Sequence, residues 1–176
     1  NHPFVLAREA QVTDQMIQNG INALDNYMAY LRLQIPAKKL TNYEDDARFY
    51  AFARNINERP RDKFFDSSSI KALRKIRSCL ILKDKLTQAN KSNAEKAWDL
   101  GFELKSNRHT EVLECSRTSK LRRALKILIS PFTGFASLFT YRSEKCKKAQ
   151  KTMHALFQPV EQVIDSAVQM NRQQRR

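Results

Sequence analysis

The sequence predicts an all-α fold, a helical bundle of about six helices. The 176-residue chain contains only three glycines and five prolines, too few for the turns of an all-β protein or for a glycine-rich phosphate loop. Apolar residues instead recur at three- and four-residue steps in several separate stretches, as they do along one face of a helix. With 41% hydrophobic and 28% charged residues, the composition is that of a folded chain.

The first two predicted helices lie before residue 60. Apolar residues keep helical spacing as far as Ile35, and Pro36 ends the run. Thr41 followed three residues later by Glu44 has the pattern of a capping box. We therefore expect the second helix to begin there and to run to about Asn57.

The next two predicted helices each have an N-terminal signal. Asp66 and the serines that follow it offer N-cap residues for a helix whose apolar face continues to Leu86. Ser92 with Glu95 repeats the capping box and predicts a shorter helix that carries Trp98. Both helices are expected to turn one apolar face to the core.

Two further helices complete the expected bundle. One extends from about Thr110 to Pro131, and the other has an almost continuous apolar stripe over residues 149–168, bent at Pro159. We expect a single domain over residues 1–176. Because the chain starts without a methionine, we also expect it to be a piece of a larger protein.

The basic residues are concentrated in one fifth of the chain. The formal net charge of the whole chain is +14, and the stretch from Arg117 to Lys151 holds ten basic residues against Glu144 alone. A second basic cluster consists of Lys71, Arg74, Lys75 and Arg77. Such clusters predict an anionic partner, although solvated helix faces that only keep a protein soluble have the same composition.

Fifteen uncharged residues, 127–141, lie inside the main basic stretch. As a helix they would span about 22 Å, less than the hydrocarbon core of about 30 Å, so they do not predict a transmembrane helix. Pro131 and Gly134 favour a turn instead. Residues 120–151 are therefore expected to form a helix-turn-helix hairpin with basic flanks and an apolar tip.

Such a hairpin has the composition of a peripheral membrane-binding element, in which apolar side chains enter the interface and basic side chains meet lipid phosphates. The residues expected to enter the membrane are Phe132, Phe135, Leu138 and Phe139. The residues expected to bind lipid head groups are Arg117, Lys120, Arg123, Lys126, Arg142, Lys145 and Lys148, with Arg122, Lys147 and Lys151 extending the basic surface. The alternative is that the same apolar side chains fill the core and that the corner is an ordinary turn between helices.

The expected partner is an anionic membrane, with phosphoinositide as the head group. Nucleic acid is a rival anionic partner, but no zinc-finger spacing, aromatic RNA-binding strand motif or basic leucine zipper supports it. A helical module that binds a protein partner is a third possibility from another class. In each case the chain acts by binding.

Catalysis has no sequence signature, so we expect no enzyme and no cofactor. His2, His109 and His154 are isolated, and no metal-binding or nucleophile motif surrounds them. The acidic run at residues 44–46 suits the first turn of a helix better than a metal site, so no metal is expected. The odd number and wide spacing of the cysteines, Cys79, Cys115 and Cys146, suit reduced thiols in the cytosol.

The segment Lys120–Lys151, together with scarce glycine and helices rich in Asn, Gln and Lys, resembles the accessory helical domains of effectors that intracellular bacteria inject into host cells. Several such domains bind host phosphoinositides. The resemblance implies a peripheral membrane location on the cytosolic side, within the host cell for an injected protein.

Overall fold

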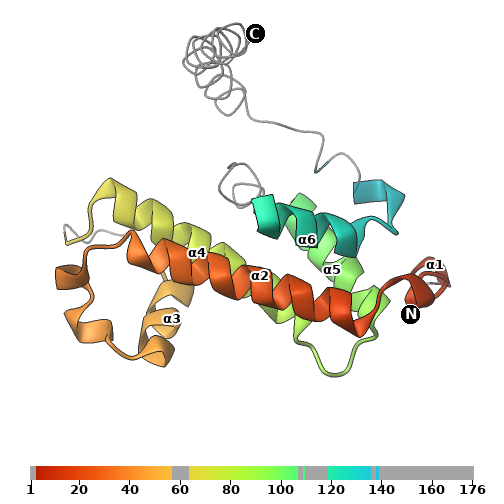
Figure 1. The fold of residues 1–176 in the computed structure, drawn as a ribbon, viewed down its shortest axis with the longest axis horizontal. Coiled ribbons are helices and arrows are strands. Elements are labelled where there is room, and N and C mark those ends of the chain that lie inside the picture. The colour runs from red at the N-terminus through yellow and green to blue at the C-terminus, as the bar shows by residue number, and fades with distance from the viewer. Residues whose placement is uncertain (1–2, 57–63, 107–108, 110–118, 136–137, 139–176) are drawn as a thin grey trace, which may run out of the picture. The chain divides into compact units, whose positions relative to one another are not determined.

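The structure, a computed structural model, describes residues 3–56, 64–106, 109, 119–135 and 138. Every regular element in this part of the chain is helical, which confirms the all-α prediction (Figure 1). The α-helices are α1 (Pro3–Leu6), α2 (Asp14–Leu33), α3 (Asp46–Arg54), α4 (Ser67–Leu86), α5 (Asn93–Ser106) and α6 (Ser119–Ile129). Short 3-10 helices lie at Glu9–Gln11, Ala37–Lys39, Thr41–Tyr43 and Thr133–Phe135.

Contacts between Cα atoms divide the chain into two units, residues 1–141 and 142–176, and all described residues belong to the first. The helix predicted over residues 149–168, the returning half of the predicted hairpin and residues 110–118 lie outside the described residues. The expectation of a single domain over residues 1–176 stays a prediction.

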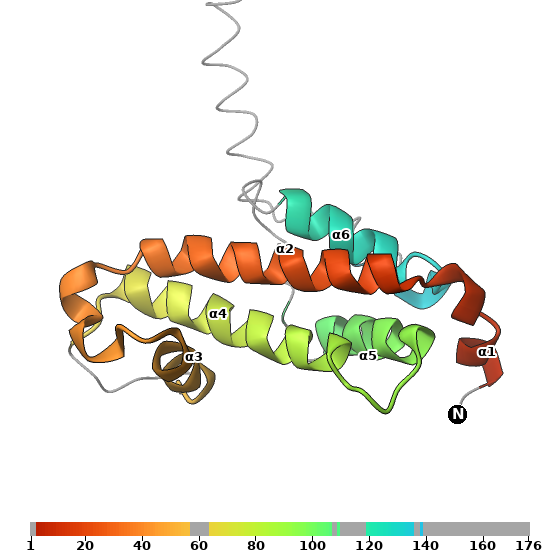
Figure 2. The same ribbon diagram turned by 60° about the horizontal axis from the view of Figure 1, so that its bottom comes forward.

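The two longest helices, α2 and α4, run antiparallel through the centre of the described bundle (Figure 2). Lys83 near the end of α4 pairs with Asp25 of α2 over 2.7 Å, and Lys39, after α2, lies 3.6 Å from Asp66, before α4. Helix α3 packs on α4, α5 packs on α4 and α1, and α6 lies on α2 and α5. The buried apolar side chains of these helices form one cluster.

Two predicted helix starts are confirmed in detail. The Asp66 carboxylate accepts a hydrogen bond from the backbone N–H of Ser69 (2.8 Å), and hydrogen bonds from Ser69 and Ser68 hold the pKa of Asp66 well below its usual range. At the start of α5 the backbone N–H of Ser92 donates to Glu95 (2.9 Å), and the N–H of Glu95 donates to the Ser92 hydroxyl (3.3 Å). This reciprocal pair is the predicted capping box.

The capping box predicted at Thr41 is wrong. Helix α3 begins after Asp45, whose carboxylate accepts a hydrogen bond from the N–H of Ala47 (3.3 Å). The preceding residues form a 3-10 helix because the guanidinium of Arg32 donates to the carbonyl oxygen of Glu44 (3.2 Å) and to that of the residue before it (3.0 Å). A contact from α2 thus overrides the local signal.

The start of α5 has a second cap that comes from a distant part of the chain. The two carboxylate oxygens of Glu9 accept hydrogen bonds from the backbone N–H groups of Asn93 and Ala94, each over 3.2 Å. The side chain of Asn93 donates in turn to Asp14 (2.7 Å). These bonds fasten the N-terminal segment to α5.

Cys79 of α4 has no exposed surface, and burial raises the pKa of its thiol to about 12. In the unfolded chain this thiol ionises near pH 9, so ionisation favours the unfolded state as the pH rises from about 9 to about 12. Between pH 8 and pH 11 we expect the parent to lose roughly 2 kcal/mol more free energy of unfolding than Cys79→Ala. Urea unfolding of both proteins at the two pH values measures the difference, and equal losses would contradict the prediction.

Candidate anion-binding surface on helix α6

The expectation that Phe132 and Phe135 insert into a membrane is wrong. Their exposed fractions are 1% and 3%, and both rings pack against Trp98 of α5, with ring centroids 5.4 Å and 5.0 Å away. Leu138 is half-buried and packs against the same core, and Phe139 lies outside the described residues. The alternative that these rings fill the bundle core is the one that the structure bears out.

The turn after α6 directs both rings inward. Its backbone is closed by hydrogen bonds from the N–H of Phe132 to the carbonyl of Ile129 (3.0 Å) and from the N–H of Phe135 to the carbonyl of Phe132 (3.2 Å). Phe135 fits because Gly101 of α5 has no side chain: a Cβ there would lie 2.5 Å from the Phe135 ring carbon Cε2. The predicted turn is therefore present, but the two phenylalanines at its tip are part of the hydrophobic core.

Helix α6 has one apolar and one basic face. Its buried residues, Leu121, Leu125, Leu128 and Ile129, recur at helical spacing and turn toward α2 and α5. The opposite face carries Lys120, Arg123 and Lys126, all exposed, and Ile127, which is 45% exposed. We call these four residues the α6 outer face.

Within the described part of the chain, no ion pair or hydrogen bond engages the three cations of the α6 outer face. Six acidic side chains of the described residues form ion pairs with other residues: Asp25, Asp46, Asp66, Asp84, Asp99 and Glu103. Among the described residues, therefore, no acidic side chain neutralises the charge of the outer face.

Two cations of the α6 outer face lie toward the end of the helix where a cation contributes least to its stability, whereas Lys126 lies in the last turn. Lys120 and Arg123 fall in the first two turns, and the first turn holds no acidic residue. The helix dipole gives this end partial positive charge, which disfavours cations by a few tenths of a kcal/mol each. Helix stability thus does not explain Lys120 and Arg123.

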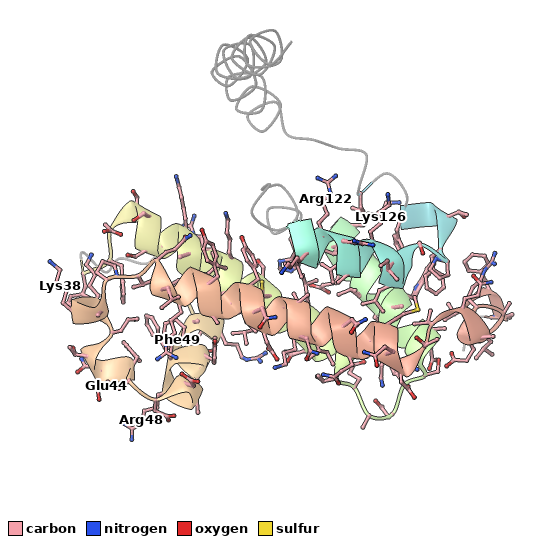
Figure 3. All side chains as sticks on the ribbon, in the orientation of Figure 1. Lys38, Glu44, Arg48, Phe49, Arg122 and Lys126 are labelled. Atoms are coloured by element: carbon pink, nitrogen blue, oxygen red, sulfur yellow. The ribbon has the colours of Figure 1, made fainter. Side chains whose placement is uncertain are left out.

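Three of the seven predicted head-group residues, Lys120, Arg123 and Lys126, are brought together on the α6 outer face. The other four, Arg117, Arg142, Lys145 and Lys148, lie outside the described residues, so a pocket built from both halves of the hairpin stays a prediction. Arg122 is half-buried on the flank of α6, and Figure 3 shows Arg122 and Lys126 projecting away from the bundle. The sequence reasoning missed Ile127, although its position one turn after Arg123 and opposite the leucines signals exposure.

His109, an isolated residue in the sequence, has partners in the structure. Its ring nitrogens lie 2.9 Å from the Ser78 hydroxyl and 3.2 Å from the Glu103 carboxylate, which Lys85 also approaches (3.5 Å). Through these contacts His109 connects α4 to α5.

No family model, curated protein or solved structure matches the chain. The resemblance to injected effectors therefore stays a prediction. Among the described residues no helix is both long and apolar enough to cross a membrane, and no three His, Cys, Asp or Glu side chains are grouped to hold a metal ion.

Proposed function

We propose that this protein docks peripherally on anionic membranes through the α6 outer face. The observation that carries the proposal is the combination of three exposed cations without an ion-pair partner in the described part of the chain and an exposed isoleucine among them. Cations meet the lipid phosphates while an apolar side chain enters the interface, as in surface-bound amphipathic helices. Unlike such helices, α6 uses its apolar stripe for the protein core.

The electrostatic contribution is large enough for reversible binding. A basic residue near an anionic leaflet contributes about 1 kcal/mol, so Lys120, Arg123 and Lys126 together supply about 3 kcal/mol. This corresponds to a partition coefficient more than 100-fold higher on anionic than on neutral vesicles. The proposed head group is a phosphoinositide, because an arginine fork between two lysine charges suits a phosphate monoester.

Nucleic acid is a weaker candidate for the same surface. Proteins that bind single strands stack bases on aromatic side chains, and the α6 outer face has none. Ile127 also gains nothing from contact with a phosphate backbone. At an anionic membrane all four residues of the α6 outer face make favourable contacts, the three cations with phosphates and Ile127 with the apolar interface.

The test removes the three cations together. We expect Lys120→Gln/Arg123→Gln/Lys126→Gln to lower the partition coefficient on phosphoinositide-containing vesicles about 100-fold, since three surface cations are lost. Co-sedimentation with phosphatidylcholine vesicles, alone or with phosphatidylserine or phosphoinositide, measures this at low and physiological salt. RNA competition in the same assay tests the rival partner.

The matched control is Lys38→Gln/Arg48→Gln/Lys96→Gln, which loses the same charge elsewhere from residues that have no ion pair in the described part of the chain. Its binding should fall only a few-fold, through the long-range field. Equal losses in both triple variants would reduce the effect to net charge, and equal wild-type binding to neutral and anionic vesicles would remove the proposal. Circular dichroism confirms that both variants remain folded.

A further inference from the structure

We propose that the first half of α4 is a second contact with the same membrane, so that α4 and α6 lie against it together. This inference rests on the proposed function of α6. The residues that carry it are Lys71, Arg74 and Lys75, which we call the α4 basic cluster. The cluster lies outside the α6 outer face and belongs to the second basic cluster of the sequence.

The cations of α4 differ between its two halves. In the second half, Lys83 pairs with Asp25 and Lys85 with Glu103. In the first half, Lys71 and Arg74 are exposed and Lys75 is half-buried, and the described residues provide no ion pair or hydrogen bond for any of them. Two cations in the second half of α4 are thus paired, whereas Lys71, Arg74 and Lys75 have no such partner among the described residues.

Two residues of the α4 basic cluster, Lys71 and Lys75, share a stripe of α4 that ends beside the place where α6 packs on α2. Lys71, Lys75 and Leu86 are spaced by four and eleven residues, which places them along one stripe of a helix. At the far end of this stripe Leu86 packs beside Gly20 of α2, where Leu128 of α6 also packs: a Cβ on Gly20 would lie 3.2 Å from Leu86 Cδ1 and 2.5 Å from Leu128 Cδ1. The same stripe therefore ends beside the place where α6 packs on α2 and carries lysines at its other end.

Helix α6 is too short to cover those lysines. Its 11 residues span about 16 Å, against about 30 Å for the 20 residues of α4. Its C-terminal end lies near α1, because Phe132 just beyond it meets Phe4 of α1 with ring centroids 6.3 Å apart. Its N-terminal end, with Lys120, therefore reaches only to the middle of the bundle, and the start of α4 extends past it (Figure 1).

Two cationic groups along one side suit a flat, extended anion better than a compact one. A single phosphate-bearing molecule would engage either the α4 basic cluster or the α6 outer face, whereas a lipid surface engages both at once. The geometry points to a bundle whose long helices lie along the membrane plane.

The test is Lys71→Gln/Lys75→Gln, compared with Lys38→Gln/Arg48→Gln. Both variants lose two charges, and Figure 3 shows Lys38 and Arg48 projecting from other sides of the bundle than Arg122 and Lys126. On vesicles of phosphatidylcholine with phosphatidylserine and phosphoinositide, we expect the α4 variant to lower the partition coefficient at least tenfold and the control less than threefold. Lys71→Glu, at an exposed position, and Arg48→Glu provide a second matched pair that leaves half-buried Lys75 intact.

The outcomes separate this inference from the proposed function. Loss of binding in the α6 triple variant with wild-type binding in both α4 variants overturns the inference and leaves the α6 proposal standing. Equal losses in the α4 variants and their matched controls also overturn it, since net charge alone would explain them. Wild-type binding in the α6 triple variant removes the proposed function itself.

Discussion

Phe132→Ala is expected to destabilise the protein by about 3–5 kcal/mol, a large part of the 5–15 kcal/mol that holds a typical domain folded. The ring is 1% exposed and touches Trp98, Phe135 and Phe4, so truncation leaves a cavity between α1, α5 and the turn after α6. Urea unfolding followed by circular dichroism measures the loss.

Phe102→Ala is the matched control for this prediction. Phe102 lies on α5 one turn after Trp98, but its ring is 57% exposed, so its truncation should cost less than about 1 kcal/mol. If Phe132→Ala kept the parent stability and lost only vesicle binding, the ring would belong to a membrane contact after all. Comparable small losses for both variants would contradict its place in the core.

Leu125→Ala is expected to cost about 2–5 kcal/mol. Leu125 has no exposed surface and lies in the middle of the stripe by which α6 packs on α2 and α5. Because the α6 outer face is held in place by that stripe, partial undocking of α6 should also weaken binding to anionic vesicles. Urea unfolding and vesicle co-sedimentation of the same samples connect the two effects.

Ile127→Ala tests the opposite face of the same helix. Its side chain is 45% exposed, so the free energy of unfolding should change by less than about 1 kcal/mol. A larger loss for Ile127→Ala than for Leu125→Ala would mean that the two faces of α6 had been assigned the wrong way round.

Much of the fold follows from local sequence. Helical spacing of apolar residues predicts α2, α4 and α5, and the caps at Asp66 and at Ser92 with Glu95 depend only on residues within one turn. Signals of this kind are independent of the rest of the chain, so these helices and their starts can be predicted without knowledge of tertiary contacts.

The features that local sequence could not predict depend on distant residues. Thr41 fails as a cap because Arg32, nine positions earlier, binds the backbone that a helix would otherwise have used. Phe135 is core because Gly101, on another helix, leaves room for its ring. An aromatic side chain beside a basic cluster has the same local pattern in either case, and only its packing partner decides whether it is buried.

The candidate surface was predictable in part for the same reason. Helical spacing alone places Lys120, Arg123 and Lys126 opposite the leucines of α6, but it does not show that six acidic residues of the described bundle pair with other residues. Which acidic residue pairs with which cation depends on how the helices pack.

The double cap on α5 links folding events that occur at different stages. Ser92 and Glu95 are close in sequence, so their bonds can form as soon as the helix nucleates. Glu9 reaches Asn93 only after a loop of 84 residues has closed, which makes its contribution late and entropically costly. Release of the N-terminal segment therefore leaves two backbone N–H groups at the start of α5 without their acceptor. Fraying of the first turn of α5 then indicates that Glu9 is not bound there.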